Sequence, residues 1–140
     1  MKGGKVLGLD WGSKRMGIAI SDPERKVASS SYTYERNNLD EDLDYIQQLV
    51  DEKEISLIVV GMPILTDGSE GEIAAKVKEF VKKLRKKVSI SVVTIDERLT
   101  SAEAERVLLS SDLSRKQRKK HRDKLAATLI LQRYLDREKN

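Results

Sequence analysis

A continuous apolar stretch in the middle of the chain, residues 55–60, constrains the fold more than any other segment. It contains Ile, Leu and Val with a single Ser, and Pro63, which cannot continue a strand ladder, follows it closely. An apolar run without alternation is typical of a parallel strand that helices cover on both faces. Amphipathic helical patterns flank the run, at residues 39–53 and 69–84. These segments predict an α/β architecture in which right-handed helical crossovers connect parallel strands.

The amino-terminal part of the chain predicts antiparallel strands that join this sheet. Residues 6–9 are an apolar run that ends on Asp10, and residues 16–20 resume the apolar pattern after a turn, as in a β-hairpin. Residues 27–34 are rich in Ser, Thr and Tyr, which suits a third strand near a sheet edge. Residues 88–95 form another apolar, β-branched strand. The expected fold is an α/β mixed sheet, an antiparallel three-strand meander plus parallel strands, flanked by helices.

The spacing of capping residues predicts where helices begin, and the length of the chain predicts the number of domains. Ser69 and Glu72 have the spacing of a capping box, which predicts a helix start. Further helices are expected at residues 100–109 and 119–136. The chain has 140 residues, of which 39% are hydrophobic, and this length suits one core rather than two. We therefore expect a single domain, residues 1–140.

The absence of cysteine excludes a disulfide framework and thiolate metal sites, so a metal must bind oxygen ligands or the single histidine, His121. The apolar run after Lys5 is too short for a signal peptide and ends on a charge, and no run is long enough to span a membrane. We expect a cytoplasmic protein without a membrane partner. The net charge of +4 permits polyanionic partners but does not require them.

Carboxylates follow the apolar strands at two places. Asp10 ends the first strand, and Asp96 and Glu97 end the strand at residues 88–95. Ligands of parallel α/β sheets bind beyond the carboxyl ends of the strands. In the last helix, Asp123 is four residues before Ala127 and shares its apolar face. We therefore expect the carboxylates to meet at one edge of the sheet.

Repulsion between such carboxylates predicts divalent cations, and Mg²⁺ or Mn²⁺ suits an all-oxygen site. Strand alternation places Asp96 and Glu97 on opposite sides, so at most one of the two points into the site, and the pattern leaves both possible. Asp10 and Asp123 also have purely structural explanations. Asp10 could simply begin a turn, and Asp123 could pair with a neighbouring cation or cap the helix.

Basic residues are dense near the last helix. Residues 115–124 contain seven Lys or Arg, a density that favours a polyanionic partner over an exposed segment without one. Carboxylates beside a basic segment fit phosphodiester cleavage, in which two metal ions activate water and stabilise the leaving oxygen. The predicted nucleic-acid contacts are Lys14, Arg15, Arg98, Arg115, Lys116, Arg118, Lys119, Lys120 and Arg122. A loop near the site is expected to contain Gly61, Asp67, Gly68 and Ser69.

Four motifs in order make the chain resemble a known family. They are LGLDWGSKRMGIA at residues 7–19, VGMP with DGSEGE at 60–72, DERLTSAEA at 96–104 and DKLAA at 123–127. The chain resembles the YqgF/RuvX family of RNase H-like proteins, described as pre-16S rRNA nucleases and as Holliday junction resolvase-like. The resemblance implies an RNase H-like fold, a cytoplasmic location and an acidic site at Asp10, Glu97 and Asp123. It thus selects Glu97 over Asp96, by analogy.

These observations lead to a main hypothesis and to alternatives. The main hypothesis is a metal-dependent endonuclease that processes the 5′ end of pre-16S rRNA, with precursor ribosomal particles as partners. One alternative is a resolvase of Holliday junctions, and another is a nucleic-acid-binding module without catalysis. Nucleotide binding, as in actin-like ATPases and sugar kinases, is disfavoured because those proteins need two related halves. Both a monomer and a homodimer are compatible with the sequence.

Overall fold

The computed structural model describes residues 4–63, 71–96 and 114–138; within the last range, the side chains of 115–120 and 123 lie outside the description. The described elements form one mixed sheet with helices on both faces. In chain order they are β1 (Lys5–Asp10), β2 (Arg15–Ser21), β3 (Ala28–Glu35), α1 (Leu39–Glu52), β4 (Ile55–Met62), α2 (Glu72–Lys87), β5 (Ser91–Asp96) and α4 (Arg115–Arg137).

The strand order is β3-β2-β1-β4-β5. The first three strands form an antiparallel meander, in which Leu9 pairs with Ile18 and Ile18 with Tyr32. β4 lies parallel to β1 on its other side, and β5 lies parallel to β4 at the edge. The predicted α/β mixed sheet is confirmed, with the first strand of the chain at its centre.

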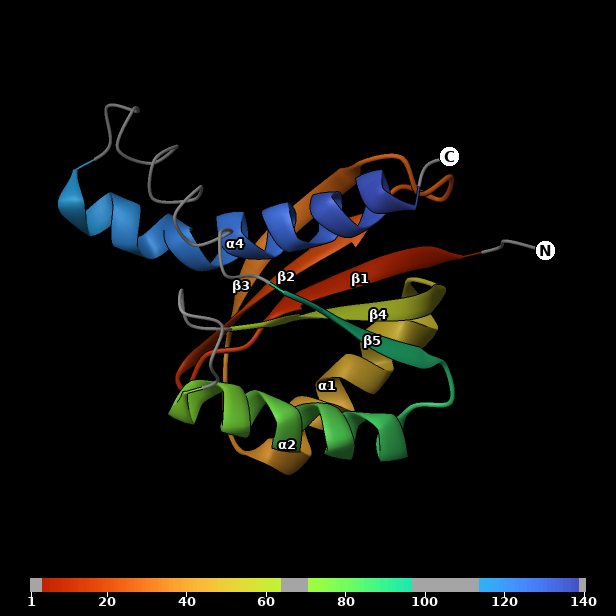
Figure 1. Ribbon diagram of the computed structural model, residues 1–140, viewed down its shortest axis with the longest axis horizontal. Coiled ribbons are helices and arrows are strands. Elements are labelled where there is room, and N and C mark those ends of the chain that lie inside the picture. Colours follow the sequence, from red (N-terminus) through yellow and green to blue (C-terminus); the bar gives the residue numbers. More distant parts are fainter. Residues whose placement is uncertain (1–3, 64–70, 97–113, 139–140) are drawn as a thin grey trace.

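The helices form two layers around this sheet (Figure 1). α4 lies along one face, over β1, β2 and β3, whereas α1 and α2 cover the other face. Leu7 and Leu9 pack into the core on the α1 and α2 side, while Val6 packs with Ala127 and Leu131 on the α4 side. Because side chains alternate along β1, each of its residues packs against one of the two helix layers.

Gly8 sets how closely α4 approaches β1. A Cβ atom at this position would lie 2.8 Å from the Cβ of Leu131 and 3.3 Å from the carbonyl oxygen of Ala127. No larger residue fits without moving the helix. Gln132, one residue further along α4, donates to the carbonyl of Lys26 and accepts from the backbone N–H of Ala28. These contacts fix the distance of α4 from the sheet and the orientation of the helix across the strands.

Three element boundaries differ from the sequence prediction. α4 begins at Arg115 and not at residue 119, because Lys, Arg and Gln are good helix formers even without an apolar stripe. α2 begins at Glu72 with Gly71 as its N-cap, so the predicted capping box is wrong: Glu72 is the first helical residue and not the third. β5 begins at Ser91, because Val88 still closes α2.

The helix predicted at residues 100–109 lies outside the described residues. Of the helices that the structure describes, none has the length and apolar content needed to cross a membrane.

Candidate active site at the carboxyl edge of the sheet

Asp10 is the last residue of the central strand β1 and is half-buried. It lies on the α4 face, since Val6 and Gly8 precede it at intervals of two residues. Its partner on β2 is Gly17. On β4, Val60 pairs with Leu9, so the next residue, Gly61, lies beside Asp10. Both lateral neighbours of the carboxylate thus lack a side chain, which leaves room around it on this face.

Asp96 ends β5 at nearly the same level but points to the other face. Ile95 belongs to the apolar cluster under α4, and Thr94 lines a groove beside α2, so alternation turns Asp96 toward α2. Asp96 is exposed, and its backbone carbonyl accepts a hydrogen bond of 3.2 Å from Arg133 Nη1. Strand alternation therefore places Asp10 and Asp96 on opposite faces of the sheet.

The backbone of α4 brings residue 123 toward Asp10. Ala127 and Leu131 lie over Gly8, and Gln132 is bonded at the opposite end of the sheet, where β3 begins. Residue 123 precedes Ala127 by one turn, about 6 Å along the axis, in the direction of the carboxyl edge. α4 therefore runs toward the edge at which β1 ends, and the convergence of the carboxylates stays a prediction. The side chain of Asp123 and all of Glu97 lie outside the description.

The donor chemistry of the edge fits a hard cation. Asp10 supplies carboxylate oxygens between two glycines, and Mg²⁺ and Mn²⁺ prefer oxygen ligands. Among the side chains that the structure describes, no three acidic or histidine groups lie close enough together to hold a metal ion.

The turn between β1 and β2 is fixed by Arg36, which follows β3. Arg36 Nη1 donates to the carbonyl oxygens of Gly12, at 3.0 Å, and of Ser13, at 3.2 Å. Its backbone N–H donates to the carbonyl of Lys14 at 3.0 Å. At Gly12 a Cβ atom would lie 2.4 Å from the carbonyl oxygen of Arg15, so only glycine fits this tight turn. The turn directly after Asp10 is thus held by hydrogen bonds from Arg36, the residue that follows β3.

Asp42 of α1 holds Arg36 in this position. Its carboxylate is fully buried and accepts from Arg36 Nε at 2.8 Å. It also accepts from the Tyr34 hydroxyl at 2.9 Å and the Asn37 backbone N–H at 3.0 Å. Burial and the hydrogen bond to Asp42 raise the pKa of Tyr34 to about 12. A buried carboxylate with these donors is fully satisfied, whereas removing one partner of such a pair costs about 3–5 kcal/mol.

Trp11 connects this network to α2, the second helix of the same layer. Arg36 lies over the Trp11 ring, 4.9 Å from its centroid, and the ring packs against Phe80 of α2 at 6.4 Å. Because Trp11 follows Asp10 directly, it faces α1 and α2 while Asp10 faces α4. The end of β1 is therefore held on the α1 and α2 side of the sheet.

The predicted basic contacts fall into two groups. Lys14 is exposed in the turn after Asp10, and Arg15 opens β2. Arg122 is exposed on α4, with the backbone of Arg115, Lys116, Arg118, Lys119 and Lys120 in the same helix. Arg98, Asp67, Gly68 and Ser69 lie outside the described residues, while Gly61 is buried beside Asp10.

Arg36 and Asp42 were not predicted from the sequence. The available signal was the spacing of Asp42, four residues before Ile46 on the buried face of α1. An acidic residue at such a position needs a buried partner, and this requirement would have identified the pair.

Comparisons with known proteins agree with the predicted resemblance. The model of a family described as RuvX, Holliday junction resolvase, matches residues 4–137. A relative from Thermoanaerobacter pseudethanolicus, named "Putative pre-16S rRNA nuclease", is 44% identical over 137 residues, which cover 97% of this chain and 99% of its own length. A relative of the same name from Caldanaerobacter subterraneus subsp. tengcongensis is 47% identical, with the same coverage.

Solved structures support the fold. A Fowlpox virus resolvase, in complex with Holliday junction DNA, superposes with a TM-score of 0.58 at 11% identity and covers 95% of this chain and 97% of its own. Thermus thermophilus RuvC, also with a Holliday junction, gives a TM-score of 0.53 at 15% identity and covers 91% of each chain. The RNase H-like α/β fold that the resemblance implied is thereby confirmed.

Proposed function

This chain belongs to the RuvX family, and on that premise we propose that it is a metal-dependent nuclease that cleaves pre-16S rRNA near its 5′ end. The observation that carries this proposal is the position of Asp10, a carboxylate between two glycines at the carboxyl edge of the sheet. A nuclease needs an open, rigid acidic site for the scissile phosphate. The substrate follows from the names of the curated relatives, and a cytoplasmic location with precursor ribosomal particles as partners belongs to the same proposal.

The proposed ligands are Asp10, Glu97 and Asp123, and they would hold Mg²⁺ or Mn²⁺. Bound divalent ions lower the pKa of a water molecule and stabilise the leaving oxygen of an in-line displacement. Glu97 is preferred to Asp96 because Asp96 points to the face opposite Asp10. Asp123 is included because α4 runs toward the edge at which β1 ends.

The basic residues would bind the phosphate backbone on both sides of this site. The turn anchored by Arg36 presents Lys14 next to Asp10. The first turn of α4 contains no acidic residue and three basic ones, an arrangement that the helix dipole disfavours. A polyanion at this end of α4 would remove that penalty. Lys14, Arg15, Arg98 and the basic residues of α4 are therefore proposed as the contacts of the RNA strand.

The test is a cleavage assay of the wild type and Asp10→Asn. The substrates are a 5′-extended 16S rRNA fragment and a four-way DNA junction, each with Mg²⁺, Mn²⁺ or EDTA, and the products are mapped. We expect metal-dependent cleavage of the RNA that falls on the order of a hundredfold or more in Asp10→Asn, with binding in EDTA retained.

Cleavage of the junction alone would favour the resolvase alternative, which the description of the family names. Intact binding without cleavage of either substrate would contradict a nuclease and favour a binding module. Size-exclusion chromatography of the protein decides between a monomer and a homodimer, because symmetric cutting of a junction needs two sites.

A further inference from the structure

A groove of about 550 Å³ lies between α2 and the edge strand β5. Four basic residues of α2 line it, Lys78, Lys82, Arg85 and Lys86, together with Met62 and Thr94. Among the described residues that line this groove, none is acidic. The groove is therefore a concave surface of one charge sign, which concentrates anions.

The basic residues of the groove are spaced along one side of α2. Lys78, Lys82 and Lys86 recur every four residues along about 12 Å of helix, and like charges at this spacing destabilise a helix. Within the described ranges, Lys82 and Lys86 have no acidic partner. Arg85 donates twice to the carbonyl of Val92, at 3.1 and 2.7 Å, and so ties α2 to β5.

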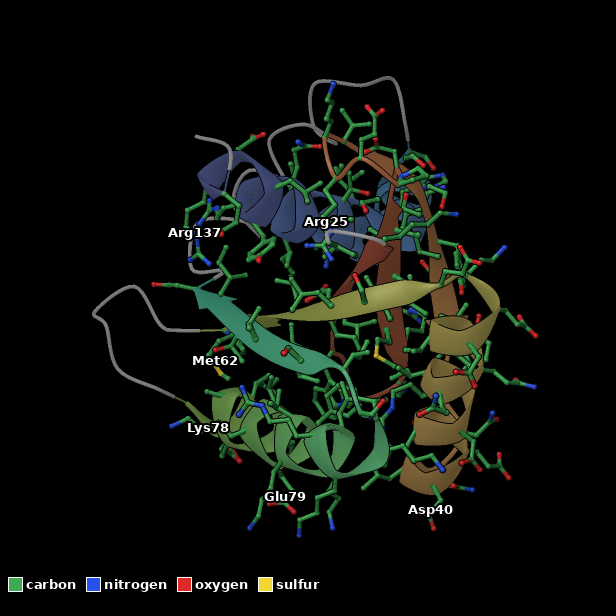
Figure 2. The ribbon with its side chains drawn as sticks, turned by 90° about the vertical axis from the view of Figure 1, so that its right-hand side faces the viewer. Arg25, Asp40, Met62, Lys78, Glu79 and Arg137 are labelled. Atoms are coloured by element: carbon green, nitrogen blue, oxygen red, sulfur yellow. The ribbon has the colours of Figure 1, made fainter. Side chains whose placement is uncertain are left out.

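Lysines on the other side of the same helix have a different arrangement. Lys83 pairs with Glu79 of α2, and Lys87 pairs with Asp44 of α1. Figure 2 shows Met62 and Lys78 close together beneath the end of β5, while Glu79 points from α2 away from the sheet. Within the described ranges, Lys82 and Lys86 of the groove thus lack the acidic partners that Lys83 and Lys87 have.

The groove begins at the edge that carries the candidate active site. Met62 is the last residue of β4 and pairs with Asp96, and Gly61, one residue earlier, lies beside Asp10. A strand of nucleic acid that leaves Asp10 past the ends of β4 and β5 would approach this groove. Phosphate groups at intervals along such a strand match lysines repeated along a helix.

We propose that this groove binds the phosphate backbone of the RNA strand that flanks the cleavage site. The proposal rests on the proposed function, because it assumes that RNA is the partner of the carboxyl edge. It assigns Lys82 and Lys86 as phosphate contacts, held in place by the attachment of Arg85 to β5. The site would then contact its substrate on both faces of the sheet, with α4 on one side and α2 on the other.

The test compares two double variants with the same change in net charge on the same helix. Lys82→Gln with Lys86→Gln removes charges in the groove, and Lys83→Gln with Lys87→Gln removes charges outside it. Gln and Lys have similar helix propensities, so both variants should melt near the wild type. Binding of a labelled 5′-extended 16S rRNA fragment is measured in EDTA at several salt concentrations, which separates binding from cleavage.

We expect the groove variant to bind about tenfold more weakly at low salt, with a salt slope reduced by roughly 0.7 for each lysine removed. The control variant should change much less, and Lys82→Arg with Lys86→Arg should restore binding. Equal losses in the groove and control variants, or no loss in either, would overturn the groove proposal. Failure of the wild type to cleave RNA that it binds would instead contradict the nuclease, and the binding comparison would still decide on the groove.

Discussion

The two strands that end in carboxylates, β1 and β5, have the same pattern in sequence and very different surroundings in the fold. β1 is central, hydrogen-bonded to β2 and β4, and the turn after Asp10 is anchored by Arg36. β5 is at the edge, where β4 is its only strand partner among the described elements, and Asp96 is exposed. Asp10 therefore ends a central strand whose following turn is anchored, whereas Asp96 ends an edge strand.

This difference indicates what makes a carboxylate suitable for catalysis. A metal ligand must be held within a fraction of an ångström, and buried neighbours with their own hydrogen bonds provide that rigidity. The end of β1 has such support in Arg36, Asp42 and Trp11. Asp96, at the end of β5, lies on the face opposite Asp10, and the following predictions test this contrast.

The prediction with the largest change in cleavage rate distinguishes two adjacent acidic residues, Asp96 and Glu97. Glu97→Gln should lower the rate of RNA cleavage on the order of a hundredfold or more, because it removes a proposed metal ligand. Asp96→Asn should stay within about threefold of the wild type, since Asp96 faces α2. Both variants are assayed with saturating Mg²⁺. A large loss in Asp96→Asn together with an active Glu97→Gln would reverse the assignment.

A second prediction concerns the support of β1. Asp42→Ala should lower the free energy of unfolding by about 3–5 kcal/mol, because it leaves the buried Arg36 guanidinium without its carboxylate. Urea denaturation measures this loss. Asp44→Ala on the same helix is the control, since Asp44 is exposed and pairs with Lys87 at the surface, so its effect should stay below about 1 kcal/mol. Equal effects would contradict the special role of Asp42.

The prediction with the smallest effect concerns how the free energy of unfolding depends on pH. Because the pKa of Tyr34 is about 12 when folded and 10.0 in the free side chain, the unfolded state loses this proton first as the pH rises. The stability contributed by Tyr34 is complete below pH 10 and is lost between about pH 10 and 12. Tyr34→Phe should therefore make the stability fall less steeply in that range. An unchanged slope would show that Tyr34 does not link α1 to alkaline unfolding.

Most of the elements could be predicted from the sequence, because their signals are local. The helix predicted at residues 39–53 is Leu39–Glu52, capped by the side chain of Asn38, and the strand at 55–60 is Ile55–Met62. The start of α4 could not be predicted, since a run of basic residues has no apolar period to reveal a helix. The candidate site was predicted at Asp10, and its Glu97 and Asp123 partners stay predictions.

Local patterns in the sequence are sufficient to predict the strands and helices, the position of an acidic residue at the end of the first strand, and the family. Only the tertiary structure decided which glycines lie beside Asp10, that Asp96 faces away from it and that Arg36 and Asp42 hold the turn. The physical reason is the range of the interactions. Alternation along one strand is a property of neighbouring residues, whereas the register between strands depends on hydrogen bonds between segments far apart in the chain.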